Sequence, residues 1–190
     1  GCATRAAHAN CANICKPVMN ADRREVLTWQ EVDKLIDHLI PQFDTEFDAI
    51  LMITRGGLVP GGLLAEALHL NTVLTAAVDF PPAMETASDP GRDRLMAWPQ
   101  FLQFPDATLL RGRRILVVDD VWGSGRTITA VRNRVAASAG APYTCVLHFN
   151  PYRSLFGNLR PDYFAASTDA HIVYPWEINR GPEAVLLKDF

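Results

Sequence analysis

The sequence predicts a doubly wound α/β domain with a mostly parallel sheet, and two stretches carry that prediction. Ile115–Val118 is an apolar run rich in β-branched residues, and a helical pattern follows at residues 128–135 after a short glycine-containing loop. Residues 47–54 form a second apolar run, and residues 60–69 form the helical pattern behind it. Strand and helix patterns that alternate in this way are typical of a parallel sheet covered by helices.

The first 27 residues have no helical or strand period. We expect residues 1–27 to form a flexible tail or the remnant of a processed leader, and residues 28–190 to form the domain. Alanine and scattered basic residues without acids at residues 1–21 are also typical of organellar transit peptides, so the expected location is the cytoplasm or the stroma of a plastid or other organelle. The tail cysteines, Cys2, Cys11 and Cys15, do not resemble a disulfide framework.

The first predicted helix begins at a capping box. Thr28 and Glu31 have the spacing at which each side chain hydrogen-bonds the backbone of the other. Apolar residues at helical spacing follow from Trp29 to Ile40, and Pro41 ends the helix. This pattern predicts that Trp29 belongs to the core.

The remaining elements are strands separated by one long irregular stretch. Strands are predicted at residues 71–80, 143–149 and 161–165. Residues 81–114 are rich in proline and charge, and so long an irregular stretch in a compact domain is usually functional or mobile. Residues 98–104 are apolar enough to pack locally, so we expect only the earlier part to move.

The residues that follow the strand at 115–118 predict a ligand site. Asp119 and Asp120 are adjacent carboxylates, and a small-residue loop leads from them into a helix. Backbone N–H groups at a helix N-terminus bind phosphate. Since the carboxylates cannot favour a phosphate, they are predicted to bind sugar hydroxyls or Mg²⁺. A ligand that carries a phosphate, a pair of hydroxyls and a metal ion is a phosphorylated ribose. The loop consists of Gly123, Ser124, Gly125, Arg126 and Thr127.

A second anion site is predicted where the strand at residues 47–54 ends. Arg55 supplies a positive charge there, and Gly56 and Gly57 allow backbone N–H groups to approach a ligand closely.

These motifs resemble those of the type I phosphoribosyltransferases, whose pattern is a hydrophobic strand, two acidic residues and a small-residue phosphate loop ending in threonine. The Thr-Arg-Gly-Gly-Leu-Val-Pro-Gly run at residues 54–61 is most similar to the xanthine–guanine branch of the 6-oxopurine enzymes. The Pro-Trp-Glu pattern at residues 175–177 resembles the C-terminal hood with which that branch covers the purine. The resemblance extends over residues 28–190 and implies a phosphoribosyltransferase-like fold with a small hood.

The resemblance implies Mg²⁺-dependent transfer of ribose 5-phosphate from phosphoribosyl pyrophosphate (PRPP) to a nucleobase, here a purine, with release of pyrophosphate. It implies that Asp119 and Asp120 hold the ribose hydroxyls and contact the metal. Residues 123–127 would hold the 5-phosphate, and Arg55–Gly57 the pyrophosphate. Its ligands would be PRPP and a nucleobase or nucleoside monophosphate, and the chain would form a homodimer or homotetramer.

The nucleobase contacts implied by the resemblance depart from the family pattern. They fall on Asn150, His171, Ile172 and Trp176. Where the family has an acid/base Asp, this chain has Gly123. Where the family has a Lys that contacts the 6-oxo group, this chain has Asn150, and where the family has an aromatic residue that stacks on the base, it has His171. Two explanations stay open: an active enzyme with altered base recognition, or a weak or inactive PRPP- or nucleotide-binding homologue with a regulatory or structural role.

Other function classes are disfavoured. The net charge of −3 and the lack of a long basic run give no support for binding nucleic acid or an anionic membrane. A Rossmann oxidoreductase would need Gly-x-Gly-x-x-Gly after its first strand, and a P-loop kinase would need Gly-Lys-Ser/Thr. The chain has neither motif.

Overall fold

The computed structural model describes residues 23–81 and 98–178. The cysteines predicted to lie in the tail and most of the first half of the predicted irregular stretch are outside the described residues.

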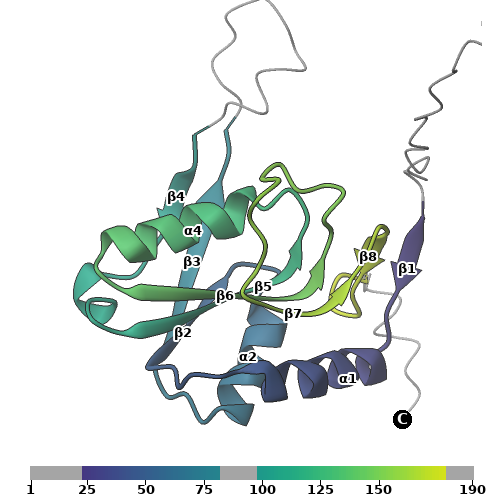
Figure 1. The fold of residues 1–190 in the computed structure, drawn as a ribbon, viewed down its shortest axis with the longest axis horizontal. Coiled ribbons are helices and arrows are strands. Elements are labelled where there is room, and N and C mark those ends of the chain that lie inside the picture. The colour runs from purple at the N-terminus through teal and green to yellow at the C-terminus, as the bar shows by residue number, and fades with distance from the viewer. Residues whose placement is uncertain (1–22, 82–97, 179–190) are drawn as a thin grey trace, which may run out of the picture.

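A six-stranded sheet forms the centre of the domain (Figure 1), in the order β4-β3-β2-β5-β6-β7. All neighbouring strands are parallel except β4, which is antiparallel to β3. The prediction of a doubly wound, mostly parallel α/β fold is therefore confirmed. The strands are β2 (Ala49–Ile53), β3 (Val73–Asp79), β4 (Gln100–Gln103), β5 (Arg114–Trp122), β6 (Ala141–Phe149) and β7 (Tyr163–Ser167).

The strand order reverses between β2 and β5. From β2 the chain passes through α2 (Leu58–Ala67) to β3 on one side, and from β5 it passes through α4 (Arg126–Ala137) to β6 on the other. In open α/β sheets, ligands bind at the carboxyl ends of the strands that flank such a reversal. The fold thus brings residues 54–57 and residues 119–125 to the same edge of the sheet.

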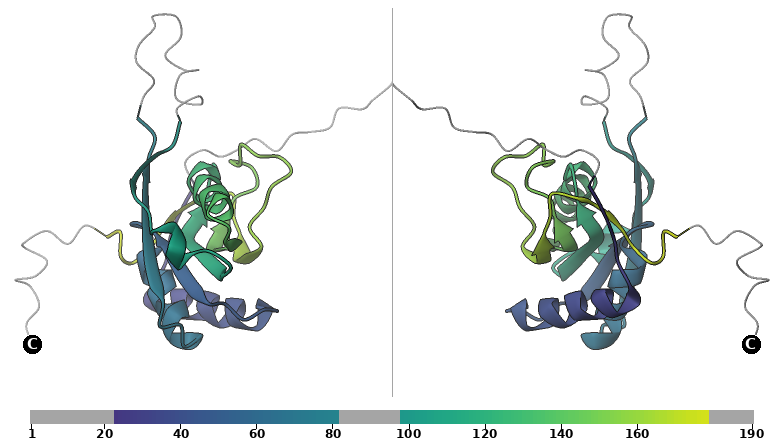
Figure 2. Two further views of the ribbon diagram at one scale, coloured as in Figure 1. Left: turned by 90° about the vertical axis from the view of Figure 1, so that its left-hand side faces the viewer. Right: turned by 90° about the vertical axis from the view of Figure 1, so that its right-hand side faces the viewer.

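Helices cover both faces of this sheet. Figures 1 and 2 show α1 (Trp29–Leu39) and α2 on one face and α4 on the opposite face. Short 3₁₀ helices occupy Ile40–Gln42 and Ala107–Leu109. Among the described residues, no helix is long and apolar enough to cross a membrane.

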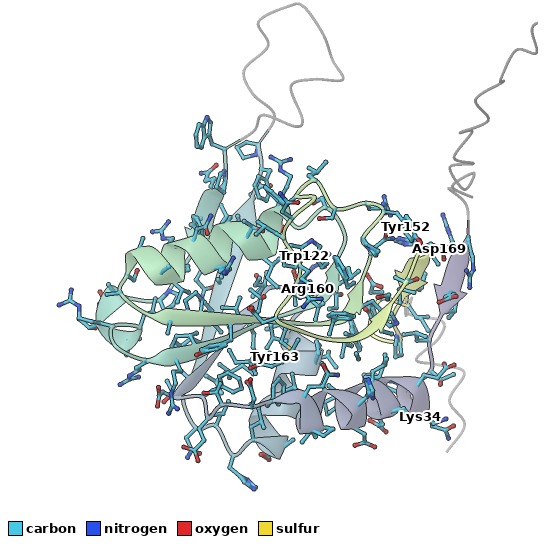
Figure 3. All side chains as sticks on the ribbon, viewed as in Figure 1. Lys34, Trp122, Tyr152, Arg160, Tyr163 and Asp169 are labelled. Atoms are coloured by element: carbon cyan, nitrogen blue, oxygen red, sulfur yellow. The ribbon has the colours of Figure 1, made fainter. Side chains whose placement is uncertain are left out.

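Each face of the sheet has its own hydrophobic cluster. Tyr163 lies in the cluster beneath α1 and α2, and Trp122 lies in the cluster beneath α4 (Figure 3). The side chains of β5 alternate between the two clusters, with Leu116 and Val118 on the first side and Ile115 and Val117 on the second. Burial on both faces explains why this strand is a continuous apolar run.

The predicted capping box at the start of α1 is confirmed. The backbone N–H of Thr28 donates to Glu31 Oε2 at 2.7 Å, and the N–H of Glu31 donates to Thr28 Oγ1 at 3.3 Å. The assignment of Trp29 to the core was wrong, because this side chain is 46% exposed. Trp29 lies in the first helical turn, where its ring contacts Trp176 with 5.9 Å between centroids.

A second, two-stranded sheet joins the N-terminal end of the described chain to its C-terminal end. β1 (Arg24–Val26) pairs in parallel with β8 (His171–Val173), with Glu25 opposite Ile172. The predicted tail was therefore too long, since Arg24–Val26 is a strand held by hydrogen bonds to β8. We call residues 170–177, which comprise β8 and the turn after it, the hood.

Two further boundaries differ from the prediction. β5 continues through both carboxylates to Trp122, because Val121 and Trp122 still pair with His148 and Phe149 of β6. Within residues 98–114, β4 pairs antiparallel with β3, so this part is less irregular than predicted. Phe101 packs against the core as expected, whereas Trp98 is 87% exposed and does not.

Candidate functional site

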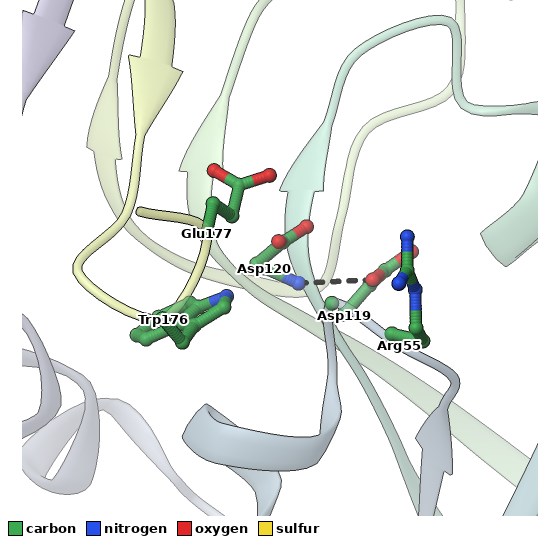
Figure 4. Close-up of a pocket in the computed structure, with 6 residues that line it drawn as sticks. Arg55, Asp119, Asp120, Trp176 and Glu177 are labelled. Carbon is green, nitrogen blue, oxygen red and sulfur yellow. Dashed lines mark hydrogen bonds between the residues drawn. The ribbon is translucent and has the colours of Figure 1, made fainter. Parts of the chain in front are cut away.

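A polar pocket of about 500 Å³ opens at the carboxyl ends of β2 and β5 (Figure 4). The turn after β2, the end of β5 and the hood each contribute side chains to it. The pocket is lined by Arg55, Gly56, Asp119, Asp120, Trp176 and Glu177.

The turn after β2 places its two glycines in different roles. A Cβ atom on Gly56 would lie 2.5 Å from the carboxyl group of Asp120, so this backbone forms the wall next to the carboxylate. A Cβ atom on Gly57 would lie 2.2 Å from the backbone oxygen of Val118. Gly57 is buried and does not line the pocket, so its lack of a side chain serves the packing of the turn on β5. The side chain of Arg55 is exposed at the pocket, and the Thr54–Arg55 peptide bond is cis.

The two carboxylates are held by backbone N–H groups. Asp119 Oδ1 accepts from the N–H of Asp120 at 3.0 Å, and Asp120 Oδ1 accepts from the N–H of Val121 at 2.7 Å. Burial raises the pKa of Asp119 well above its usual range, and the negative charge of Asp120 raises it further. Burial also raises the pKa of Asp120, to about 6, with a further contribution from the charge of Glu177. Three acidic side chains therefore share a partly enclosed space, which a bound cation would stabilise.

The raised pKa of Asp120 predicts a specific pH dependence of stability. A carboxyl with a raised pKa contributes stability at low pH, and this contribution is lost as the pH rises from about 4 to about 6. Asp120→Asn should therefore increase the free energy of unfolding relative to the unchanged protein above pH 6, by about 1–3 kcal/mol, and have little effect at pH 4. Urea unfolding between pH 4 and 8 measures the difference.

Asp48 provides the control for this pH series. Its pKa is lowered, because Arg114 donates hydrogen bonds to its carboxylate. Asp48→Asn should destabilise the protein by nearly the same amount from pH 8 down to pH 4, because a carboxyl with a lowered pKa loses its contribution only as the pH falls below its ordinary value of 3.8. Parallel curves for the two variants would show that the Asp120 carboxyl is not titrating as described.

The pocket fits a cation that is also bound by a substrate. Mg²⁺ usually takes one or two carboxylates from the protein and its other oxygens from water and substrate phosphates. Asp119 and Asp120 each have one carboxylate oxygen without a hydrogen bond to the backbone in the contacts above. Within the described ranges, no group of three His, Cys, Asp or Glu side chains forms a complete metal site. The donors present therefore suit Mg²⁺ held jointly with a ligand.

The glycine-containing loop turns from β5 into α4. Gly125 caps the helix with a φ of 78°, and its missing side chain leaves room for the Trp122 ring, which a Cβ atom would approach to 2.4 Å. The loop is tied to the chain beyond β6, because Leu155 N–H donates to the backbone oxygen of Ser124 at 3.1 Å. No acidic residue occupies the first turn of α4, so nothing there opposes an anion. The guanidinium of Arg126 lies over the Phe80 ring at 4.2 Å.

A smaller pocket of about 150 Å³ adjoins the first and shares Asp120 and Glu177 with it. It brings together most of the residues predicted to contact a nucleobase. Of the four residues predicted to contact the base, Asn150, His171 and Ile172 line it, whereas Trp176 lines the larger pocket. Gly123, which was predicted to hold the 5-phosphate, also lines the smaller pocket.

Asn150 has a structural task as well as a place in this pocket. Its side-chain oxygen accepts from the N–H groups of Tyr152 and Arg153 at 3.1 and 3.2 Å, which fixes the turn after β6. That turn brings Arg153 to the pocket, so a cation lines the pocket although Asn150 stands where a lysine was expected.

The sequence did not single out Glu177, Arg153 or Tyr174 as site residues. Glu177 was part of the Pro-Trp-Glu pattern, which was the one available signal for it. Arg153 follows a turn without any periodic pattern, and Tyr174 has the appearance of a core residue in sequence. Their places depend on how the hood and the turn after β6 fold against β5.

Comparisons with known proteins find a matching family model and related sequences. The family model for the phosphoribosyl transferase domain matches residues 23–149. A xanthine-guanine phosphoribosyltransferase of Ruegeria sp. is 30% identical over 156 residues, covering 80% of this chain and 77% of the relative.

Solved structures show the same fold. The purine phosphoribosyltransferase of Pyrococcus horikoshii is 25% identical, with a TM-score of 0.67 over 82% of this chain and 95% of that one. The xanthine-guanine-hypoxanthine phosphoribosyltransferase of Helicobacter pylori is 18% identical, with a TM-score of 0.65 over 82% of this chain and 94% of that one.

Proposed function

This chain belongs to the type I phosphoribosyltransferase family, and we propose that it transfers ribose 5-phosphate from PRPP to a purine base with release of pyrophosphate. In this reaction a ring nitrogen of the base bonds to C1 of the ribose, the bond from C1 to the pyrophosphate oxygen breaks, and the base nitrogen loses its proton. A homodimer or homotetramer in the cytoplasm or an organelle stroma is the expected form of the enzyme.

The observation that carries the proposal is the meeting of three parts at the reversal of strand order. Arg55 and Gly56 line one side of the pocket, and Asp119 and Asp120 line another. The glycine-containing loop begins at Gly123, three residues after Asp120, and leads into α4 at Arg126. The Arg55 guanidinium suits a pyrophosphate, and the two carboxylates suit the ribose hydroxyls. The backbone N–H groups of the loop suit a 5-phosphate.

Each part has a role in the proposed reaction. Arg55 and the backbone at Gly56 hold the pyrophosphate as negative charge develops on its leaving oxygen. Asp119 and Asp120 accept hydrogen bonds from the ribose hydroxyls and keep C1 facing the base. The N–H groups of residues 124–127 bind the 5-phosphate, and the hood limits access of water from one side.

Asp119 and Asp120 are also the residues that would hold Mg²⁺. The bound ion would neutralise part of the charge on the pyrophosphate and on the buried acids. Burial raises the pKa of both acids, and a bound cation would favour their ionised forms.

The smaller pocket is proposed to take the base. Its side chains include a cation, Arg153, and an anion, Glu177. Such a pair can donate to the exocyclic 6-oxygen and accept from a ring N–H, as a 6-oxopurine requires. His171 offers an imidazole for stacking at the same pocket.

The proposal is tested by measuring pyrophosphate release from PRPP with guanine, xanthine, hypoxanthine, adenine, uracil and orotate, each with Mg²⁺ and with EDTA. We expect release with at least one 6-oxopurine and none with EDTA. Release with a pyrimidine alone would contradict the assignment of the base pocket. Lack of release with every base would contradict the transfer reaction.

A second candidate, a weak or inactive PRPP-binding homologue, is favoured by Gly123 alone. A general acid or base typically contributes 10²- to 10⁴-fold to a rate. A Cβ atom at Gly123 would meet nothing within 4 Å, so an aspartate fits there and can reach the base pocket.

The substitution Gly123→Asp distinguishes the two candidates. For an active enzyme with altered base recognition, Gly123→Asp should change kcat less than about threefold. For a homologue that lacks only the acid/base group, it should raise kcat by about tenfold or more.

Gly157→Asp is the matched control for this substitution. Gly157 also has open space around its Cβ position, but it lies outside both pockets. A rise in kcat in both variants would show an effect of added charge and not of a restored acid/base group.

A further inference from the structure

A buried chain of hydrogen bonds joins the hood to the strand that carries the carboxylates. The hydroxyl of Tyr174 donates to the backbone oxygen of Asp120 at 2.9 Å. Nδ1 of His148, on β6, lies 2.8 Å from the same hydroxyl. Tyr174 is 1% exposed and His148 is 5% exposed, so water does not compete for these bonds.

The direction of these bonds follows from the groups involved. A backbone oxygen only accepts, so the Tyr174 proton points to Asp120. The hydroxyl oxygen then accepts from His148, which must carry its proton on Nδ1. Burial lowers the pKa of His148, so the imidazole is neutral at neutral pH, in the Nδ1–H tautomer.

The same tyrosine also organises the part of the hood that faces the pocket. Its backbone N–H donates to Glu177 Oε2 at 2.9 Å, and its backbone oxygen accepts from the N–H of Glu177 at 3.0 Å. Its ring is stacked on Trp176, with 4.5 Å between centroids and 7° between planes. Trp176 and Glu177 both line the pocket that holds Asp119 and Asp120 (Figure 4).

We propose that Tyr174, supported by His148, is a positioning residue that docks the hood on β5 and fixes the backbone at Asp120. Tyr174 borders the smaller pocket but is only 1% exposed, and its positioning role acts through Asp120, Trp176 and Glu177. A hood that is not docked would leave the base pocket open, because hood residues line both pockets. This inference rests on the proposed function for its effect on catalysis, but its structural part is independent of it.

Tyr163 provides a matched comparison within the same hydrophobic cluster. It is 7% exposed, and its hydroxyl donates to Asp44 at 2.7 Å. It lies at the start of β7, opposite Cys145 and away from the carboxyl ends of the strands. Tyr163→Phe therefore removes a hydroxyl from the same cluster without touching the hood.

The test compares Tyr174→Phe with Tyr163→Phe. Both variants keep the ring and should fold, with melting temperatures lowered by similar amounts. For Tyr174→Phe, kcat/KM for the base should fall about 10- to 100-fold, since a buried acceptor loses its partner. For Tyr163→Phe, it should fall less than about twofold. His148→Phe, which leaves the bond from Tyr174 to Asp120 in place, should give an intermediate loss.

Structural measurements test the same inference without catalysis. Hydrogen exchange should show faster exchange of the amides of hood residues 174, 176 and 177 in Tyr174→Phe only. Nitrogen NMR should show the Nδ1–H tautomer of His148 in the unchanged protein and in Tyr163→Phe, and its loss in Tyr174→Phe. Equal kinetics and equal hood exchange in the two tyrosine variants would overturn the inference.

The two proposals fail in different ways. If the unchanged protein released no pyrophosphate with any base, the proposed function would fail. The exchange and tautomer measurements would still decide whether Tyr174 docks the hood. If the unchanged protein were active and Tyr174→Phe matched Tyr163→Phe, only the positioning role would fail.

Discussion

Replacing Asp119 and Asp120 together by asparagine should reduce pyrophosphate release from PRPP by about 10³-fold or more. Asparagine keeps oxygen acceptors for the N–H groups of Asp120 and Val121, so the local backbone can be retained. It removes the two negative charges that the ribose hydroxyls and Mg²⁺ are proposed to meet. Steady-state kinetics with saturating base, at several Mg²⁺ concentrations, measure the loss.

Stability separates this effect from unfolding. Burial raises the pKa of both carboxyls, the charge of Asp120 raises that of Asp119 further, and the charge of Glu177 raises that of Asp120 further. The double variant should therefore be more stable than the unchanged protein at pH 7.5. Asp106→Asn is the control, since Asp106 caps a short helix away from both pockets and should leave the rate unchanged. A double variant that is stable and retains a tenth of the activity would rule out a central role for the two carboxylates.

Gly56→Ala should reduce kcat/KM for PRPP by about 10²-fold, with little loss of stability. The added methyl group would lie 2.5 Å from Cγ and Oδ1 of Asp120 and 2.6 Å from Oδ2, so the carboxylate must turn away from its position. The atoms displaced are at the end of a side chain and not in the backbone, so the domain can remain folded. A misplacement of about 1 Å at a reacting centre is enough for a loss of this size.

Gly62→Ala is the matched control for that substitution. Gly62 lies in α2, and a Cβ atom there meets nothing within 4 Å. The change should leave activity unaltered and stabilise the helix by about 0.5–1 kcal/mol. Equal activity in the two alanine variants would show that the Asp120 carboxylate tolerates the displacement, against the role given to it here.

Local sequence patterns predicted the parts of the fold that depend on local interactions. The Thr28 capping box, the end of α1 near Pro41 and the apolar run of β5 each need only a few neighbouring residues. The order of strand, carboxylates and glycine loop also placed Asp119 and Asp120 correctly at the pocket, because parallel strands end at the same edge of the sheet.

The parts that the sequence did not predict depend on contacts between distant segments. Arg24–Val26 is three residues long and becomes a strand only because β8, far along the chain, pairs with it. Trp29 fits the apolar period of α1, yet it is the first residue of the helix and lies half exposed beside Trp176. Arg153, Tyr174 and Glu177 reach the site through turns whose geometry no periodic pattern encodes.

The most direct test of the account is the product balance of a single reaction. PRPP, Mg²⁺ and the preferred base of the panel are mixed with the protein, and nucleoside monophosphate and pyrophosphate are quantified together by phosphorus NMR. The site described here predicts that the two products form in equal amounts and that neither forms without the base. Consumption of PRPP without a nucleotide, or no consumption at all, would contradict the assignment of this pocket to phosphoribosyl transfer.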